Sequence, residues 1–273
     1  MIRMSNIWDR TTAFIGAHRR DLTVIALLGI ALPSAASAIV EPLGAASDQT
    51  TRVMVTIIGI AAILMTMWGQ LGLTAMTLAD GGGVGRAMAT ASARFLPLLG
   101  AVIPLGLGLV LLGLPIFLIL AAAGVDFSQM STPGYTPPVS PATGLLLFVY
   151  LVILLPVVLV LAARMLLVNP AVIGDRLSFG AIARSWNLTR GLTFKLIGVL
   201  LLYVVIVVVA MLATQTVVGV ITRLLFSAEG PVNASTVITA IAVALVTTLF
   251  SVLSTVFVAK LYRAVVGAES SGT

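Results

Sequence analysis

Six long apolar stretches constrain the fold of this chain more than any other feature of its sequence. A helix needs about 20 apolar residues to cross the hydrocarbon core of a bilayer, and each stretch is close to or beyond that length. A backbone in lipid must also satisfy its own hydrogen bonds, which favours helices over open strands. The sequence therefore predicts an all-α integral membrane protein, a single polytopic domain over residues 1–273 with six transmembrane helices. The predicted spans are residues 22–40, 53–78, 95–123, 145–168, 196–221 and 236–259.

The overall composition agrees with this fold class and excludes several functions. Hydrophobic residues make up 60% of the 273 residues and charged residues 9%, whereas soluble domains carry about 25% charged residues. A soluble enzyme, a disordered chain and a free nucleic-acid binder are therefore excluded. The net charge of +6 is better explained by orientation in a bilayer, and we expect no nucleic-acid partner.

The distribution of Lys and Arg predicts this orientation. Of the 15 Lys and Arg residues, only Arg52 and Arg223 flank the spans on one side, and the rest lie on the other. Cytoplasmic loops are enriched in Lys and Arg. We therefore expect both termini to lie in the cytoplasm. The protein itself is expected in the inner membrane of a bacterial cell.

The N-terminal segment allows two interpretations. Residues 2–20 mix apolar and arginine side chains, which is typical of an amphipathic helix that leads into the first span at the membrane surface. Alternatively, the pair Arg19-Arg20, the apolar run that follows and the small residues 36–38 resemble a cleavable signal. Asp21 directly follows the arginine pair and cleavage would leave five spans, so we expect the segment to be retained.

The loop of residues 174–195 is expected to hold a second amphipathic interfacial helix. Phe179, Ile182 and Trp186 fall on one helical face there, beside a basic face. A simpler interpretation is that the charges only fix orientation and that Trp186 is an ordinary interface anchor. The residues expected to contact anionic headgroups or a partner protein are Arg176, Arg184, Trp186, Arg190 and Lys195.

A motif in the same loop resembles a known family. The run Arg184-Ser185-Trp186-Asn187-Leu188-Thr189-Arg190-Gly191, followed by a long apolar span, is similar to the membrane domain of glycerophosphoryl diester phosphodiesterases and of related six-span bacterial inner-membrane proteins. The resemblance implies the fold and the location. It implies no activity, because we expect no catalytic domain before the end at Thr273. Supporting matches are Asn169-Pro170, Arg94-Phe95-Leu96-Pro97 and Leu261-Tyr262-Arg263.

The inventory of reactive side chains predicts a protein that is not an enzyme. His18 is the single histidine, there is no cysteine, and no carboxylate falls inside a predicted span. Asp80 and Asp175 are too few to hold a metal, and each is expected to cap a helix or to pair with an arginine. We therefore predict no catalytic residues, no cofactor and no metal.

Three functions remain after these exclusions. The first is an accessory or interaction module associated with lipids or envelope homeostasis, which contacts anionic headgroups or a membrane or cytoplasmic protein. The second is a transporter or permease component for a small neutral or amphiphilic solute, with a polar path that includes Gln70 and Gln215. The third, a phosphodiesterase, is disfavoured by the missing carboxylates and histidines.

Overall fold

The chain folds into helices throughout the described residues, which in this computed structural model are 4–46, 48–129, 134–226, 230 and 232–270. The helices, in chain order, are α1 (Met4–Ala17), α2 (Arg19–Ala26), the π-helix η1 (Leu27–Ala31), α3 (Leu32–Ala46), α4 (Gln49–Leu78), α5 (Val84–Ala122), the 3₁₀-helix η2 (Phe127–Gln129), α6 (Pro141–Met165), α7 (Val168–Gly174), α8 (Gly180–Leu188), α9 (Thr193–Leu225) and α10 (Ala234–Ser270).

Six helical segments are long and apolar enough to cross a membrane. Each contains or overlaps one of the predicted spans, so the all-helical class and the presence of six helices of membrane-spanning length and hydropathy are confirmed. The segments are Arg19–Gly44, Gln49–Leu78, Val84–Ala122, Pro141–Gly174, Thr193–Leu225 and Ala234–Ser270.

Several helices extend beyond the apolar stretches that predicted them. The third begins at Val84 rather than near residue 95, and the last continues to Ser270 rather than ending near residue 259. Polar residues flank the apolar stretches in both cases, so hydropathy underestimates the helix length. Local signals define other ends: the Ser140 hydroxyl accepts a hydrogen bond from the Thr143 amide at 3.2 Å, directly before Pro141 begins α6.

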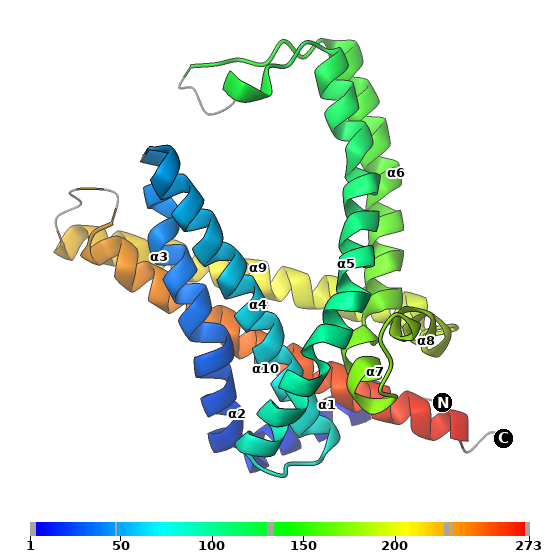
Figure 1. Cartoon of the computed structure of the whole chain (residues 1–273). Helices are drawn as coiled ribbons and strands as arrows, with labels where there is room; N and C mark the ends of the chain where they lie inside the picture. The colour runs from blue at the N-terminus through cyan, green and yellow to red at the C-terminus, as the bar shows by residue number, and fades with distance from the viewer. Residues whose placement is uncertain (1–3, 47, 130–133, 227–229, 231, 271–273) are drawn as a thin grey trace.

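Helices α5 and α6 stand upright as antiparallel neighbours, α3 and α4 form a second pair, and α9 runs across the molecule at a steep angle to α5 and α6 (Figure 1). The upright pair α5 and α6 stands apart from α3 and α4 at its upper end, and α10 contacts α1, α3, α4 and α9. Both ends of the chain, the turn between α4 and α5, and helices α7 and α8 all lie at the lower end.

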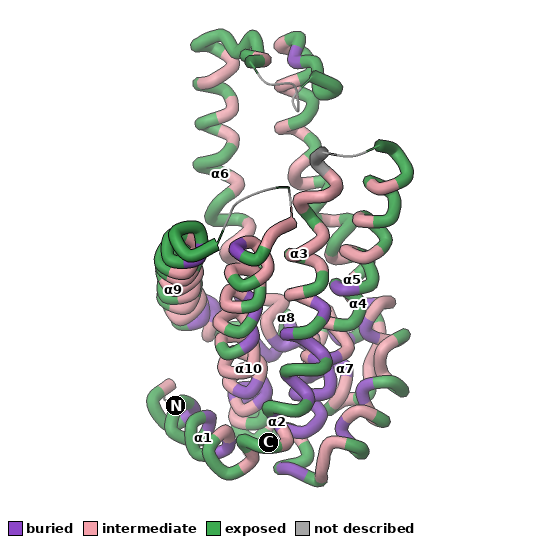
Figure 2. Tube along the Cα trace, turned by 90° about the vertical axis from the view of Figure 1, so that its left-hand side faces the viewer, coloured by how far each residue is buried: buried purple, intermediate pink, exposed green. Residues whose placement is uncertain are grey.

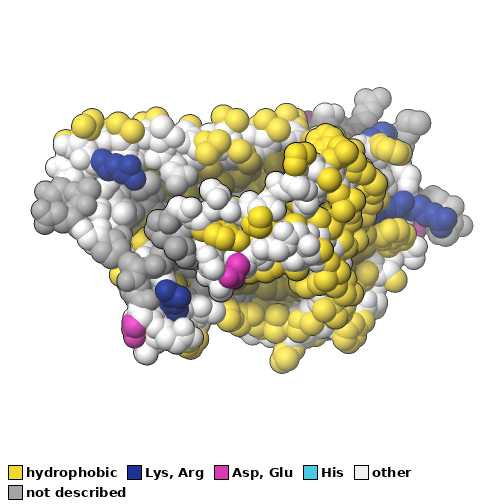
Figure 3. All heavy atoms as spheres, turned by 90° about the horizontal axis from the view of Figure 1, so that it is seen from above, with side chains coloured by type: hydrophobic (Ala, Val, Ile, Leu, Met, Phe, Trp, Pro, Cys, Tyr) yellow, Lys and Arg dark blue, Asp and Glu magenta, His cyan; other side chains and the backbone are white. Residues whose placement is uncertain are grey.

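Burial is concentrated at this lower end, and the upper halves of the helices are mostly exposed or partly exposed (Figure 2). Leu71, Leu98, Leu167 and Leu261 come from α4, α5, the α6–α7 junction and α10, and all are essentially inaccessible. Large apolar side chains elsewhere are exposed, such as Leu224 at 81%. Seen from above, the molecule shows broad apolar surfaces and only isolated charged side chains (Figure 3). Such exposed apolar surface is what lipid contact requires.

Candidate functional site

Helix α8, which carries the motif singled out in the sequence, is clamped to the junction between α6 and α7. The fully buried Ser185 donates its hydroxyl hydrogen to the Arg164 carbonyl at 2.6 Å and accepts from the Leu167 amide at 3.2 Å. These are backbone groups at the end of α6, where helical partners run out. The buried Thr189 donates in turn to the Ser185 carbonyl at 2.9 Å. Ser185 and Thr189 are therefore structural residues that fix α8 in place.

Trp186 contacts the cationic side chain of Arg164 and is partly exposed at the surface of the protein. Arg164 Nη1 donates to the Trp186 carbonyl at 3.0 Å, and the guanidinium carbon lies 4.9 Å from the centre of the indole ring. This distance is within the range of a cation–π interaction. Trp186 is still 41% exposed, so its ring has a fixed direction and a free face.

Arg184 joins α8 to the end of α10 through two carboxylates. Its Nε donates to Asp175 at 2.8 Å, and its two terminal nitrogens donate to the oxygens of Glu269 at 3.0 and 2.7 Å. The hydrogen bonds to Glu269 and then to Asp175 raise the pKa of Arg184. Its charge is thus compensated within the protein. The pairing of Asp175 with an arginine was expected from the sequence and is confirmed, whereas the bond to Glu269 was not expected.

The other three basic residues of the predicted contact set face outward. Arg176, Arg190 and Lys195 are exposed, and no described residue forms an ion pair with any of them. Arg176 has a left-handed backbone, with φ of +57°, and its carbonyl accepts from Arg94. Arg176, Arg190 and Lys195 are therefore available to an anionic partner.

A hollow lies on the outer face of α8, and we call it the α8 groove. It has a volume of about 440 Å³ and is lined by Phe179, Ile182, Ala183, Trp186 and Asn187. Phe179 is 65% exposed. The α8 groove is therefore lined by the apolar face that the sequence predicted, together with the side-chain amide of Asn187.

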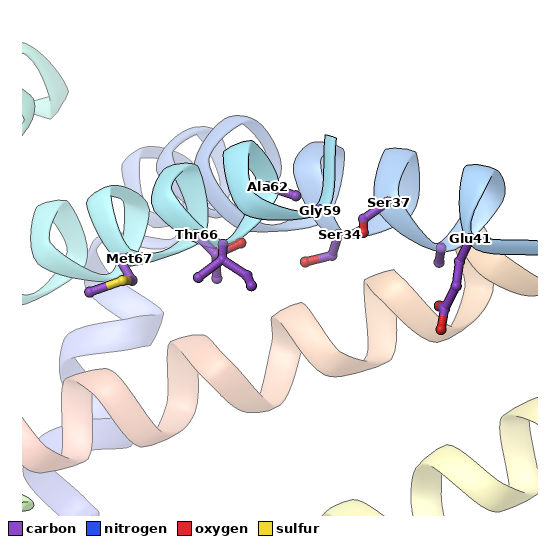
Figure 4. A pocket seen from close by; sticks show the side chains of 9 residues that line it. Ser34, Ser37, Glu41, Gly59, Ala62, Thr66 and Met67 are labelled. Carbon is purple, nitrogen blue, oxygen red and sulfur yellow. The ribbon is translucent and has the colours of Figure 1, made fainter. Parts of the chain in front are cut away.

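A second hollow lies along the contact between α3 and α4, and we call it the α3–α4 slot (Figure 4). Its volume is about 390 Å³. Its polar side chains are Ser34, Ser37 and Glu41 from α3 and Thr66 from α4, with Gly59 opposite Ser37. In Figure 4 the Glu41 and Ser34 side chains point from α3 toward the ribbon of α10.

The α3–α4 slot was not predicted from the sequence. Glu41 was expected outside the first span, whereas α3 continues through Pro42 to Ala46, and residues 36–38 were considered as a possible signal-cleavage site. The missed signal is the spacing of Ser34, Ser37 and Glu41, because positions i, i+3 and i+7 share a helical face.

The two glutamines of the predicted polar path are not brought together. Gln70 is half-buried on α4 and Gln215 is exposed on α9. Helix α4 packs mainly against α3, α5 and α10, and α9 against α10 and α6. Neither glutamine lines the α8 groove or the α3–α4 slot.

Asp80 and His18, two other titratable residues near the lower end, form contacts within the protein. Asp80 accepts from Lys260 at 2.8 Å and from Arg263 at 2.5 Å. His18 stacks on Phe14, with ring centres 4.3 Å apart. Within the described ranges, no group of three His, Cys, Asp or Glu residues is placed to hold a metal ion.

Comparison with known proteins gives one match. A family model described as a domain of unknown function (DUF7847) matches residues 22–265, and nothing in that match links the chain to the membrane domain of glycerophosphoryl diester phosphodiesterases. No curated protein and no solved structure matches the chain.

Proposed function

The chain belongs to the DUF7847 family, and we propose that it is a non-enzymatic membrane protein whose α8 surface binds anionic lipid headgroups. The observation that carries the proposal is the juxtaposition of the α8 groove with uncompensated cations on the same short stretch of chain. An exposed Trp and Phe beside basic residues suits the boundary between headgroups and acyl chains.

Charge and location complete the proposal. Arg176, Arg190 and Lys195 are exposed and form no ion pair with described residues, and each basic residue near an anionic surface contributes about 1 kcal/mol. We place the α8 surface at the cytoplasmic face of a bacterial inner membrane, with the chain acting as an accessory module in lipid or envelope homeostasis. A protein partner at the same surface is the competing occupant.

Tryptophan quenching tests this proposal on the full chain. The variants Trp8→Phe and Trp68→Phe leave Trp186 as the reporter, since the chain has three tryptophans. In phosphatidylcholine bilayers that contain a minor fraction of brominated phosphatidylglycerol, we expect quenching beyond the bulk lipid ratio. Combining Arg176→Gln, Arg190→Gln and Lys195→Gln should lower this local enrichment at least about tenfold, because three contributions of about 1 kcal/mol are lost.

The matched control removes two charges elsewhere. Arg52→Gln with Arg223→Gln changes the two basic residues of the opposite flanks and should leave the quenching of Trp186 unchanged. Equal quenching of the wild type and the triple variant would rule out headgroup binding by these residues. Saturable capture of a soluble protein with no lipid preference would favour the partner instead.

A permease component for a small amphiphilic solute is the second candidate function. The α3–α4 slot favours it, because polar side chains line a hollow between two helices that are long enough to span a bilayer. This version of the hypothesis moves the polar path from Gln70 and Gln215 to Ser34, Glu41 and Thr66. Uptake of a labelled solute into proteoliposomes, lost on filling the slot, is the test that separates it from an accessory role.

A further inference from the structure

We propose that the α3–α4 slot binds the primary ammonium group of a small amphiphile, with Glu41 as its counter-ion. The inference depends neither on headgroup contact at α8 nor on transport. It rests on the placement of unpartnered polar groups in a hollow between membrane helices.

The slot has matching walls on its two helices. Ser34 and Glu41 are seven positions apart on α3, and Gly59 and Thr66 are seven apart on α4, so each wall is about 10 Å long. A methyl group added at Gly59 would lie 3.9 Å from the Ser37 hydroxyl, which places these two residues opposite each other. Small residues on the α4 wall keep the space open.

A close helix crossing lies beyond one end of the slot. A Cβ atom built at Gly29 would lie 2.6 Å from the Gly69 Cα, so the two backbones touch there. Gly29 belongs to the π-helix η1 (Leu27–Ala31), directly before α3. Single π-turns inside α-helices are frequent at functional sites, and this one separates the slot from the packed lower end.

The polar groups of the slot have no partner within the protein. The side chains of Ser34, Ser37, Glu41 and Thr66 form no hydrogen bond or ion pair with any described residue. The hydroxyls of Thr74, Thr77 and Thr248, by contrast, donate to the carbonyl four residues earlier at 2.6–2.8 Å. Glu41 is exposed, and Ser34, Ser37 and Thr66 are partly exposed, so all four side chains are accessible to a ligand. Polar groups without a partner are costly in a bilayer, and a ligand that pairs with them removes that cost.

The polar groups at the Glu41 end of the slot favour an ammonium group as the ligand. An ammonium group has three N–H donors. Glu41 offers a carboxylate, Ser37 lies one turn away on the same helical face, and Ala38 between them also lines the slot and has a backbone carbonyl acceptor. That carbonyl lacks its usual helical donor, because residue 42 is a proline without an N–H.

Charge and size narrow the ligand class further. No Lys or Arg lines the slot, so an anion would meet the Glu41 carboxylate without compensation. Ile63 and Met67 line it as well and suit a short hydrocarbon portion. The volume of about 390 Å³ is at the small end of ligand pockets. The ammonium group could belong to a free alkylamine or to the headgroup of phosphatidylethanolamine.

Calorimetric titration of the full chain in phosphatidylcholine nanodiscs tests the site, with octylamine as the probe and empty nanodiscs as the blank. We expect saturable binding of octylamine and none of octanol, which has the same chain length without the charge. Glu41→Gln should weaken octylamine binding at least tenfold, by about 1.4 kcal/mol. The control Asp48→Asn removes an exposed carboxylate on the other side of Pro42 and should bind as the wild type does.

A second variant keeps the test decisive if Glu41→Gln does not fold. Gly59→Leu fills the slot without changing its charge and should also abolish binding. Octylamine binding that survives either variant would overturn the proposal. Replacing part of the phosphatidylcholine by phosphatidylethanolamine separates the two sources: competition with octylamine identifies the lipid headgroup as the ligand, and unaltered octylamine binding identifies a free amine. Trp186 quenching in Glu41→Gln should be unchanged, so failure here leaves the α8 proposal standing.

Discussion

The charged side chains at the lower end of the molecule divide into two groups with different physical roles. Asp80 binds Lys260 and Arg263, and Arg184 binds Asp175 and Glu269, so these residues connect segments far apart in the sequence. The exposed cations near α8 make no such contacts with described residues. The first group should therefore affect stability, and the second group should affect binding.

The contribution of Asp80 to the free energy of unfolding can be measured by lowering the pH. Hydrogen bonds from Arg263 and then from Lys260 lower the pKa of Asp80 from 3.8 to about 2. A carboxyl with a lowered folded-state pKa stabilises the protein above its unfolded pKa and loses that contribution as the pH falls. The Asp80 side chain is 56% exposed, so screening leaves about 1 kcal/mol. We expect the wild type to lose this amount between about pH 4 and pH 2.

The comparison variant is Asp80→Asn, which should be less stable at neutral pH and lack this part of the pH dependence. Reversible unfolding in mixed micelles, followed by circular dichroism at several pH values, measures both effects. If the free energy of unfolding depended on pH in the same way in the wild type and in Asp80→Asn, the ion pairs of Asp80 would contribute nothing to stability.

The geometry of Arg184 depends on a guanidinium group rather than on charge alone. A lysine keeps the charge but cannot bind Asp175 and both oxygens of Glu269 together. Arg184→Lys should therefore destabilise the protein by about 1–2 kcal/mol in the same unfolding assay. The matched change Arg190→Lys alters an exposed residue of the same motif and should stay within about 0.5 kcal/mol of the wild type. Equal effects would contradict the bridging role of Arg184.

At the level of helices, the crossing of η1 and α4 depends on two glycines in direct contact. A Cβ built at Gly69 would lie 2.7 Å from backbone atoms of Gly29, which is closer than atoms can approach. Gly69→Ala should force the helices apart and destabilise the protein by about 1–3 kcal/mol. Gly198→Ala in α9 meets nothing within 4 Å and should stabilise it by about 0.5–1 kcal/mol. Loss of stability in both variants would indicate a general intolerance of alanine instead.

The helices could be predicted from the sequence because their signals are local. Apolar length alone indicated all six membrane helices, and the spacing of Phe179, Ile182 and Trp186 indicated the face that lines the α8 groove. Contacts between distant residues had no such signal: Arg184 and Glu269 are 85 positions apart. To predict a polar path through Gln70 and Gln215, one must know which helices are neighbours. Hydropathy does not provide that information.

The α3–α4 slot could not be predicted because the end of α3 could not be located from the sequence. The spacing of its α3 residues was visible, but Glu41 lies beside Pro42, which is typical of a loop. The helix nevertheless continues for four residues beyond that proline, because a proline near a helix end removes only one hydrogen bond. The helix boundary, rather than the residue type, decided whether the carboxylate was placed inside or outside the span.

For the molecule as a whole, the described structure places η2 opposite the end that holds α8 and both ends of the chain (Figure 1). That arrangement has two possible orientations in a membrane, and the charge distribution distinguishes them. From the order of the predicted spans, only Arg52 and Arg223 of the 15 Lys and Arg residues are expected on the same side as η2. The asymmetry favours an orientation with α8 in the cytoplasm.

Cysteine labelling tests this orientation directly, because the natural chain has no cysteine. Ser128→Cys in η2 and Asn187→Cys in α8 replace exposed residues at opposite ends. A membrane-impermeant maleimide should label Ser128→Cys in intact cells and Asn187→Cys only after the membrane is permeabilised. Leu155→Cys, on an exposed apolar face of α6, should remain unlabelled in both conditions, because thiols ionise poorly in hydrocarbon. The reverse pattern would place the basic residues of α8 outside the cell, where they could not bind the anionic cytoplasmic leaflet.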